Sequence, residues 1–596
     1  MPQSILFILA LLPIAVVLVL LVVMRRSAKF AMLVAYATAV VLALAVWGQS
    51  IATVAGATVN GLVTALTLLF IIFGAILLLQ TVQESGAIRA IRNGFTELSP
   101  DRRIQALIVA WLFGSMIEGA SGFGTPAAVA APLLVAIGFP AMAAILVTLI
   151  IQSTPVSFGA VGTPMLVGVG TGLANSDVVT QSIAPTTLPE YVVQLAVNVA
   201  MVHALVGFVI PLIMVGMLTR FFGAQRSFRE GFAVWPFALF CGLAFTIPYF
   251  LVALLLGPEF PSLLGGLIGL AIVVPAARRG FLMPRTRFDF PKRAGWNENW
   301  FGRMQPATAA ATTTAGERAE GNGISLLRAW SPYLVVALLL VATRTVAPLK
   351  AALTSPEATL AFQDLFGSGI NASAQLLYSP GTILILASLL SFLIFRMSGS
   401  AYGRAWRNSA ATMVAAAPAL LIAVPMVQVF INTGRGSLES MPLVLAETVA
   451  GVTGGFWPLF SPLIGALGAF VAGSNTVSNM MFSLFQFSAA EQIGLTGLGT
   501  ILVVTLQAVG GAAGNMICVH NVVAASAVVG LTDREGDVIR MTLIPMAYYT
   551  LQAGLIGMAL ISGGIWWALA GVWLAVVLTA MLFNRGRAMP GAVATA

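Results

Sequence analysis

One apolar stretch, residues 114–164, constrains the fold of this chain more than any other. It reads GSMIEGASGFGTPAAVAAPLLVAIGFPAMAAILVTLIIQSTPVSFGAVGTP, with glycines, hydroxyls and prolines interrupting it at Gly119–Pro126 and at Gln152–Pro164. Irregular backbone is not tolerated against lipid tails, so each interruption must be buried in protein or line a wet cavity. The stretch holds a single carboxylate, Glu118. An acid at membrane depth beside irregular backbone indicates a functional site.

The composition places the chain in a membrane. Of its 596 residues, 59% are hydrophobic and only 8% are charged, whereas roughly a quarter of the residues of a soluble domain are charged. The net charge of +9 comes from short basic loops, a pattern that sets membrane topology and does not indicate nucleic-acid binding. The two cysteines, Cys241 and Cys518, lie in apolar segments and predict neither a disulfide framework nor a metal site. We expect no cofactor.

Apolar runs of about 20 residues can cross the hydrocarbon core, and we expect about thirteen full crossings. The first is a retained span rather than a signal peptide, because no basic region precedes it. Basic loops should be cytoplasmic, which puts the N-terminus outside and the C-terminus in the cytoplasm. The predicted crossings lie at 4–23, 30–47, 61–82, 141–172, 191–219, 232–256, 263–277, 331–346, 381–395, 410–430, 500–530, 543–561 and 565–583.

Two further apolar segments must enter and leave by the same face to keep the basic loops on one side. The first, residues 104–137, is interrupted at Glu118–Pro126, and the second, residues 455–487, is interrupted at Gly473–Asn479. We therefore expect two re-entrant hairpins that enter from opposite faces.

The order of these interruptions predicts an inverted repeat. Each hairpin is followed by an interrupted crossing, with the second breaks expected at Gln152 and at Gln507–Asn515. Corresponding interrupted segments in two halves indicate the binding site of a secondary transporter. The expected fold class is an all-α polytopic membrane protein with scaffold and transport parts. The predicted divisions are scaffold helices at 1–103, a first core at 104–219 (hairpin 104–137, interrupted helix 141–172), scaffold helices at 220–277, a mobile cytoplasmic linker at 278–328, scaffold helices at 329–454, a second core at 455–561 (hairpin 455–487, interrupted helix 500–530), and a last helix with a cytoplasmic tail at 562–596.

Four motifs resemble the L-lactate permease family of bacterial monocarboxylate transporters: GSMIEGASGFGTP, PVSFGAVGTP, AWSPY at Ala329–Tyr333, and GSNTVSNMMFSLFQ at Gly473–Gln486. The resemblance implies proton-coupled uptake of L-lactate, and in relatives of glycolate, across the bacterial cytoplasmic membrane. Ser474–Thr476 is also similar to the hairpin-tip motif of a wider ion-transporter superfamily. That similarity implies an elevator arrangement, in which a transport domain moves against a scaffold.

The residues themselves suit a small carboxylate substrate. A broken helix offers free backbone N–H groups and a positive dipole end, and neutral side chains add hydrogen bonds. The alternative for each glycine is that it only allows close helix packing. The predicted substrate-binding residues are Gly119, Ser121, Gly122, Gly124, Thr125, Ser153, Thr154, Gly473, Ser474, Asn475, Thr476, Ser478, Gly511, Gly514 and Asn515.

Proton coupling is assigned to Glu118 and His520. Desolvation favours the neutral form of a carboxyl group, so a buried acid can carry a proton across with the anion. The alternative for Glu118 is a permanently protonated group that holds the hairpin tip together. His520 lies beside the second interruption, whereas His203, on a long apolar helix, is interpreted as a packed or hydrogen-bonded residue.

The sequence also bears on three other functions. The chain has no GxSxG, HExxH or Walker motif, so we do not expect an enzyme. Re-entrant hairpins also occur in channel filters, which leaves an anion channel open, and oxygens around Ser474–Thr476 could bind Na⁺ in a sodium-coupled symporter. The expected partners are a small monocarboxylate (L-lactate, D-lactate or glycolate), protons and the lipid bilayer, and a homodimer through the scaffold helices remains open.

Overall fold

The structure is a computed structural model that describes residues 2–20, 24, 28–96, 99–122, 124–174, 176–302, 324–435, 438–531 and 534–584. Within these residues it is nearly all helical, and eleven helices are long and apolar enough to cross a membrane. The chain is therefore a multi-pass membrane protein. The central part of the predicted linker, Pro306–Ala315, lies outside the described residues.

The chain divides into two compact units, and each is built from separate stretches of sequence. The first unit comprises Met1–Gly86, Thr163–Leu195 and Trp330–Ala508, and the second comprises Ala87–Gly162, Ala196–Ala329 and Val509–Ala596. Four helices pass from one unit to the other along the chain: α9 (Gly159–Thr163), α12 (Leu188–Gly207), α18 (Leu326–Thr345) and α25 (Leu498–Gly514).

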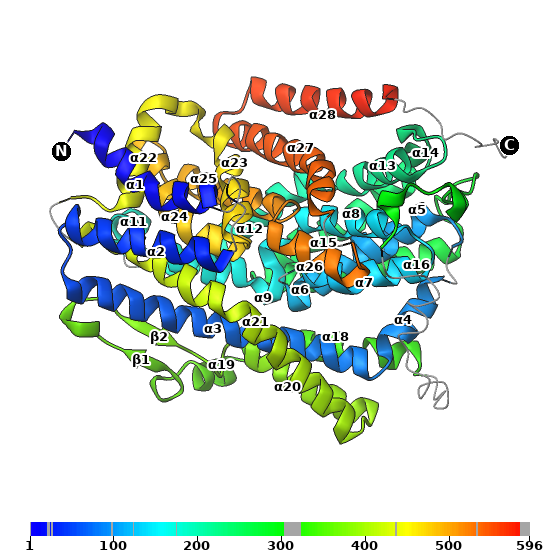
Figure 1. Ribbon diagram of the computed structural model, residues 1–596, viewed down its shortest axis with the longest axis horizontal. Helices are drawn as coiled ribbons and strands as arrows, with labels where there is room; N and C mark the ends of the chain where they lie inside the picture. Colours follow the sequence, from blue (N-terminus) through cyan, green and yellow to red (C-terminus); the bar gives the residue numbers. More distant parts are fainter. Residues whose placement is uncertain are drawn as a thin grey trace. The chain divides into compact units, whose positions relative to one another are not determined.

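The first unit is organised around one long helix, α3, against which α20 and α21 pack (Figure 1). At 34 residues, α3 is about 50 Å long. It begins where Ser50 Oγ accepts a hydrogen bond from the N–H of Thr53 at 3.0 Å. A Cβ on Gly61 of α3 would lie 2.7 Å from the backbone nitrogen of Pro425, so a glycine is required where α3 crosses α21.

The other elements of the first unit include two short strands. Because β1 and β2 pair antiparallel, from Leu360 opposite Ala374 to Phe362 opposite Ala372, the all-α expectation is corrected to nearly all-helical. The elements are α1 (Gln3–Leu18), α2 (Ala28–Ala45), α3 (Ile51–Glu84), α10 (Gly170–Leu173), α11 (Asp177–Ile183), α19 (Ala347–Leu353), β1 (Leu360–Phe362), β2 (Ala372–Ala374), α20 (Pro380–Phe395), α21 (Gly399–Ile431), α22 (Met441–Thr453), α23 (Trp457–Ala472) and α24 (Asn475–Gln492).

In the second unit, α6 packs against α16 and α7, and α8 packs against α7, α13 and α27. A π-helical segment, Ala106–Phe113, joins α5 to α6. The elements are α4 (Ala87–Thr96), α5 (Arg102–Gln105), α6 (Gly114–Ser121), α7 (Thr125–Ala136), α8 (Ala141–Ile150), α13 (Ile210–Phe222), α14 (Phe228–Phe232), α15 (Trp235–Leu256), α16 (Pro261–Arg278), α26 (Val519–Val529), α27 (Glu535–Ser562) and α28 (Ile565–Phe583).

The helices differ from the predicted crossings in two places. The run predicted as one crossing at 191–219 is two helices, α12 and α13, separated by a turn at Phe208 and Val209. Helix α22 lies in a segment for which no crossing is predicted. By contrast, α20 coincides with the helix predicted at 381–395, and α1 covers residues 4–18 of the crossing predicted at 4–23. Pro211 in the first turn of α13 explains the split, because proline begins helices readily but disrupts their interior.

Three basic loops meet at one end of the second unit. Asp101 pairs with Arg103 at 2.6 Å, and Arg103 also donates to the backbone carbonyls of Thr286 and Glu230. Nearby, Trp300 packs its ring 5.1 Å from that of Phe222. Residues 278–302 of the predicted linker therefore belong to the second unit, where they pack against its other basic loops.

Candidate functional site

The first predicted hairpin has a sharp break between α6 and α7. Gly122 and Gly124 have φ of +63° and +75°, a region that favours glycine because it has no Cβ. Thr125 closes the turn by donating from Oγ1 to the carbonyl of Gly122 at 2.7 Å. Gly119 and Ser121 lie in the last turn of α6, where both are buried. The helix break thus lies inside protein, as the sequence predicts.

Glu118 is enclosed beside this break. Its side chain is 1% exposed, and its Oε2 has no hydrogen-bond partner among the described residues. A Cβ on Gly159 would lie 2.6 Å from Glu118 Oε1, and one on Gly119 would lie 2.6 Å from the backbone carbon of Ser262. The carboxyl group therefore sits where α6 meets the first interrupted crossing, in a space that Gly159 leaves open, while Gly119 allows α6 to approach α16.

The first interrupted crossing loses regular helical structure over about a dozen residues. After α8 it forms 3₁₀ turns at Ile151–Ser153 and Pro155–Phe158. Ala160 and Val161 then adopt φ of +44° and +56°, a conformation that costs a residue with a side chain roughly 1–2 kcal/mol. Strain of this kind concentrates at functional sites.

A chain of hydrogen bonds holds this interruption to α12 and α27. Ser157 Oγ lies 2.8 Å from His203 Nε2, and His203 Nδ1 lies 2.6 Å from the Tyr549 hydroxyl. That hydroxyl is 3.1 Å from Thr154 Oγ1, which is 3.3 Å from Ser153 Oγ. The interpretation of His203 as a hydrogen-bonded residue is confirmed. Through Ser157, His203 also fixes the interrupted crossing to α12.

The tip of the first hairpin also meets the second interruption. A Cβ on Gly124 would lie 2.7 Å from Asn521 Oδ1, and Asn521 Nδ2 donates to Gln152 Oε1 at 2.9 Å. Gln152 Nε2 and Asn515 Oδ1 are buried without partners among the described residues. These side chains are free to bind a polar ligand.

The second interruption lies later than predicted. Helix α25 continues to Gly514, and the irregular segment runs from Asn515 to Cys518 before α26 begins. Gln507 and Gly511 are therefore inside a helix, which corrects the break expected at Gln507–Asn515. The side chain of His520, in the first turn of α26, lies outside the described part of the structure.

The second predicted hairpin lies in the first unit. Helix α23 ends at Gly473, which has φ of +77°, and Ser474 caps α24 by accepting a hydrogen bond from the N–H of Thr476 at 3.2 Å. The Asn475 side chain is 1% exposed, and its amide nitrogen and oxygen both lack partners among the described residues. A capped helix N-terminus with an unpartnered amide is suited to an anion or a polar ligand.

Helix α24 packs against the segment that follows the first interruption. Asn479 Nδ2 donates to the carbonyl of Pro164 at 3.1 Å, and Gly168 lies against the backbone of Thr476. On the other side of α24, Ser478 donates to the carbonyl of Gly465 at 2.9 Å and receives a bond from Gln507 Nε2 at 3.1 Å. Each hairpin thus packs against the distal part of an interrupted crossing: α24 on residues 164–169, and α7 on α26.

The predicted site residues form two groups. One group lies in the second unit, on the first hairpin and on parts of the two interrupted crossings, and the other lies in the first unit, at the second hairpin. The first group contains Glu118, Gly119, Ser121, Gly122, Gly124, Thr125, Ser153, Thr154, Gly511, Gly514 and Asn515, and the second contains Gly473, Ser474, Asn475, Thr476 and Ser478.

Several polar residues of these groups were not predicted. They are Gln152, Ser157, His203, Asn479, Gln507, Asn521 and Tyr549. Each is an uncharged or weakly basic side chain in an apolar segment. That pattern predicts a buried polar residue, but it does not predict which residue it bonds. No group of three His, Cys, Asp or Glu side chains among the described residues could hold a metal ion.

Comparison with known proteins identifies the family. A model of the L-lactate permease family matches residues 6–562. The chain belongs to the L-lactate permease family. A Haemophilus influenzae relative in this family is 32% identical, over 92% of this chain and 97% of its own length. An L-lactate permease of Bacillus subtilis is 27% identical, over 80% of this chain and 81% of its own. The glycolate permease of Escherichia coli is 27% identical, over 92% and 94%.

Proposed function

We propose that this protein takes up L-lactate and related 2-hydroxy monocarboxylates, including D-lactate and glycolate, by proton symport. Its membership of the L-lactate permease family supports the substrate class, and relatives are named for lactate and for glycolate. The observation that carries the proton coupling is Glu118, a buried carboxyl group with an unpartnered oxygen at a helix break.

Substrate binding is assigned to the two helix breaks. The backbone N–H groups that open α7 and α24 offer positive dipole ends to a carboxylate. Within the first unit, the unpartnered amide of Asn475 can donate to a carboxylate. Within the second unit, Gln152 Nε2 can donate to a carboxylate, and Asn515 Oδ1 can accept from the hydroxyl group of a 2-hydroxy acid. None of these residues carries a fixed charge, so release of the anion need not overcome a strong ion pair.

The arrangement of elements supports an inverted repeat. In sequence order, each half contains a hairpin followed by an interrupted crossing, and each hairpin packs against the distal part of the other half's interrupted crossing. We assign the two hairpins and the two interrupted crossings to the transport core and the remaining helices to a scaffold. Movement of the core against the scaffold gives alternating access in the bacterial cytoplasmic membrane, with the N-terminus outside.

The test is uptake of radiolabelled L-lactate into proteoliposomes under an imposed inward proton gradient or an imposed sodium gradient. Native protein and Glu118→Gln are compared, with Glu84→Gln as the matched control because Glu84 pairs with Arg404 at 2.8 Å on an exposed surface. We expect proton-driven accumulation in the native and control proteins. In Glu118→Gln, accumulation is lost while lactate exchange remains.

Each other outcome has a defined meaning. Accumulation driven by sodium would identify a sodium-coupled symporter and refute the proton mechanism. Uptake that does not saturate and shows no exchange would identify a channel. Proton-driven accumulation that persists in Glu118→Gln would remove Glu118 from the coupling site. Unlabelled D-lactate and glycolate, added as competitors, define the substrate range.

A further inference from the structure

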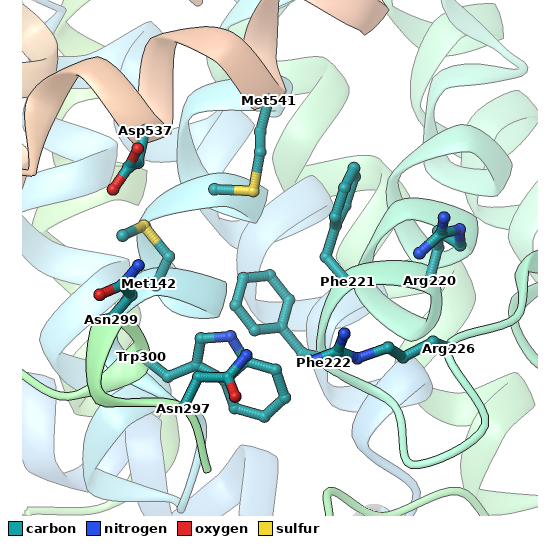
Figure 2. A pocket seen from close by; sticks show the side chains of 10 residues that line it. All are labelled: Met142, Arg220, Phe221, Phe222, Arg226, Asn297, Asn299, Trp300, Asp537 and Met541. Atoms are coloured by element: carbon teal, nitrogen blue, oxygen red, sulfur yellow. The ribbon is translucent and has the colours of Figure 1, made fainter. Parts of the chain in front are cut away.

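A cavity of about 290 Å³ lies at the end of the second unit where the basic loops meet (Figure 2). It is distinct from the residues around Glu118, and its volume is near the lower end of the range for small-molecule sites. Its polar lining comes from the end of α13 and the loop after it, from residues 297–300, and from the start of α27. The lining side chains used below are Arg220, Phe222, Arg226, Asn299, Trp300 and Asp537.

Arg226 is held in an unusual way for a surface arginine. Its backbone has φ of +46°, in the left-handed region that side chains rarely adopt. Its Nε is buried and has no hydrogen-bond partner among the described residues. Figure 2 shows its guanidinium extended toward Phe222 and Trp300. A strained backbone that presents an unpartnered cationic donor to a cavity points to a ligand.

The charges of the lining favour an anion. Arg220 uses Nε to bond Asn584 Oδ1 at 3.2 Å, which leaves the rest of its guanidinium for other acceptors. Asp537 is the acidic member of the lining. Its Oδ2 lies 3.7 Å from Nη1 of Arg534, so the arginine offsets the negative charge of Asp537. Two guanidinium groups suit a phosphate better than a single carboxylate, because a phosphate offers more oxygens as acceptors of charge-assisted hydrogen bonds.

The rest of the lining fits an organic group. The rings of Phe222 and Trp300, with centroids 5.1 Å apart, offer an apolar wall, and the Asn299 amide offers further hydrogen bonds. We propose that this cavity binds a phosphate-bearing organic anion, with the phosphate on Arg226 and Arg220 and the organic part against Trp300. Such a phosphate can belong to a lipid headgroup, which basic pockets between membrane helices bind, or to a soluble metabolite, because arginine recognises phosphate in either setting.

Thermal denaturation of the full-length protein in detergent tests the proposal. The soluble probe is AMP, with adenosine as the probe that lacks the phosphate. The lipid probe is phosphatidylglycerol, which is an anion, with phosphatidylcholine as its zwitterionic counterpart, whose phosphate is neutralised by its own choline cation. A ligand that binds only the folded state raises the melting temperature, and the rise increases with the ratio of the ligand concentration to its Kd.

Arg226→Gly removes the guanidinium while suiting the positive φ, so this variant keeps the loop conformation. Arg229→Gln is the matched control, because Arg229 is an exposed arginine of the same loop region that does not line the cavity. We expect AMP or phosphatidylglycerol to raise the melting temperature of the native and control proteins. We expect at least a tenfold weaker effect in Arg226→Gly, and none from adenosine or phosphatidylcholine.

The soluble probe and the lipid probe distinguish the two possible sources of the phosphate. A response to AMP alone identifies a soluble ligand, and a response to phosphatidylglycerol alone identifies a lipid headgroup. The proposal is overturned if neither probe shifts the melting temperature, or if Arg226→Gly responds as strongly as the native protein. The melting temperature of Arg226→Gly without any probe, expected to equal or exceed that of the native protein, verifies that the variant is folded.

Discussion

His203 Nδ1 and the Tyr549 hydroxyl lie 2.6 Å apart, although 346 residues separate them in the chain. Both side chains are completely buried. Because the other ring nitrogen of His203 bonds Ser157, the imidazole connects α27 to the first interrupted crossing. The pair therefore holds irregular backbone in place from two intact helices.

Replacing Tyr549 with phenylalanine should weaken this connection. The change leaves His203 Nδ1 without its partner and removes one of the two hydroxyl contacts of Thr154 Oγ1, and a buried polar group without a bond costs about 1–3 kcal/mol. We expect a lower melting temperature and slower lactate uptake. The adjacent Tyr548→Phe is the control, because its hydroxyl makes only a 3.5 Å contact with the Val206 carbonyl. Equal effects from the two variants would contradict a specific role for the His203–Tyr549 bond.

Gly119→Ala should be destabilising even though alanine is the better helix former. The new Cβ would lie 2.6 Å from the backbone carbon of Ser262 and closer still to Leu263, so α6 and α16 must separate. Overpacking of this kind typically costs about 1–3 kcal/mol. The control, Gly571→Ala in α28, adds a methyl group with no atom within 4 Å and should be neutral or stabilising. Denaturation curves of the two variants give the comparison.

Asp101→Asn tests the cluster that joins the basic loops. Asp101 is 3% exposed and accepts hydrogen bonds from Arg103 and from the N–H of Phe288. Removing one charge of a buried pair costs about 3–5 kcal/mol, because the other charge stays buried alone. Asp289→Asn removes an exposed partner of Arg102 and should cost about 0–1 kcal/mol. Similar melting temperatures for the two variants would refute the structural importance of the buried pair.

Glu230 should make stability depend on pH. Burial raises the pKa of Glu230, and the nearby Arg103 guanidinium only partly opposes this. Between the unfolded and folded pKa values the folded state holds more protons, so stability falls as pH rises through that window. Glu230→Gln should therefore melt higher than native protein at pH 8 and equally at pH 4.

Glu357 should make stability depend on pH in the opposite direction. Hydrogen bonds from its own backbone N–H and from Ser355 lower the pKa of Glu357. Its contribution to stability is therefore present above the unfolded pKa and is lost as pH falls. Glu357→Gln should melt slightly lower than native protein at pH 8 and equally at low pH. The same sign for both variants would show that the assigned environments are wrong.

The sequence predicts the breaks better than it predicts what surrounds them. Glycine and proline next to hydroxyls mark the hairpin tips at Gly122–Pro126 and Gly473–Ser474, because these residues act through local backbone geometry. The hydrogen bond between Asn521 and Gln152 joins residues 369 positions apart. A contact over that distance cannot be predicted from the local pattern of the sequence. Gly510 and Gly511 show the converse error: they indicate a break, yet they lie within α25, since glycine also serves close packing between helices.

The interleaving of the two units bears on how the protein is made. The first unit needs residues from both ends of a span that runs from Gly86 to Ala508, which a ribosome takes roughly 20–80 s to synthesise. Its earliest helices must wait in the membrane for that time with part of their packing surface uncovered. Splitting the gene within the codons for residues 303–323 would give two polypeptides, neither of which contains all the residues of one unit. Active protein would then require both fragments in one cell, because each supplies what the other lacks.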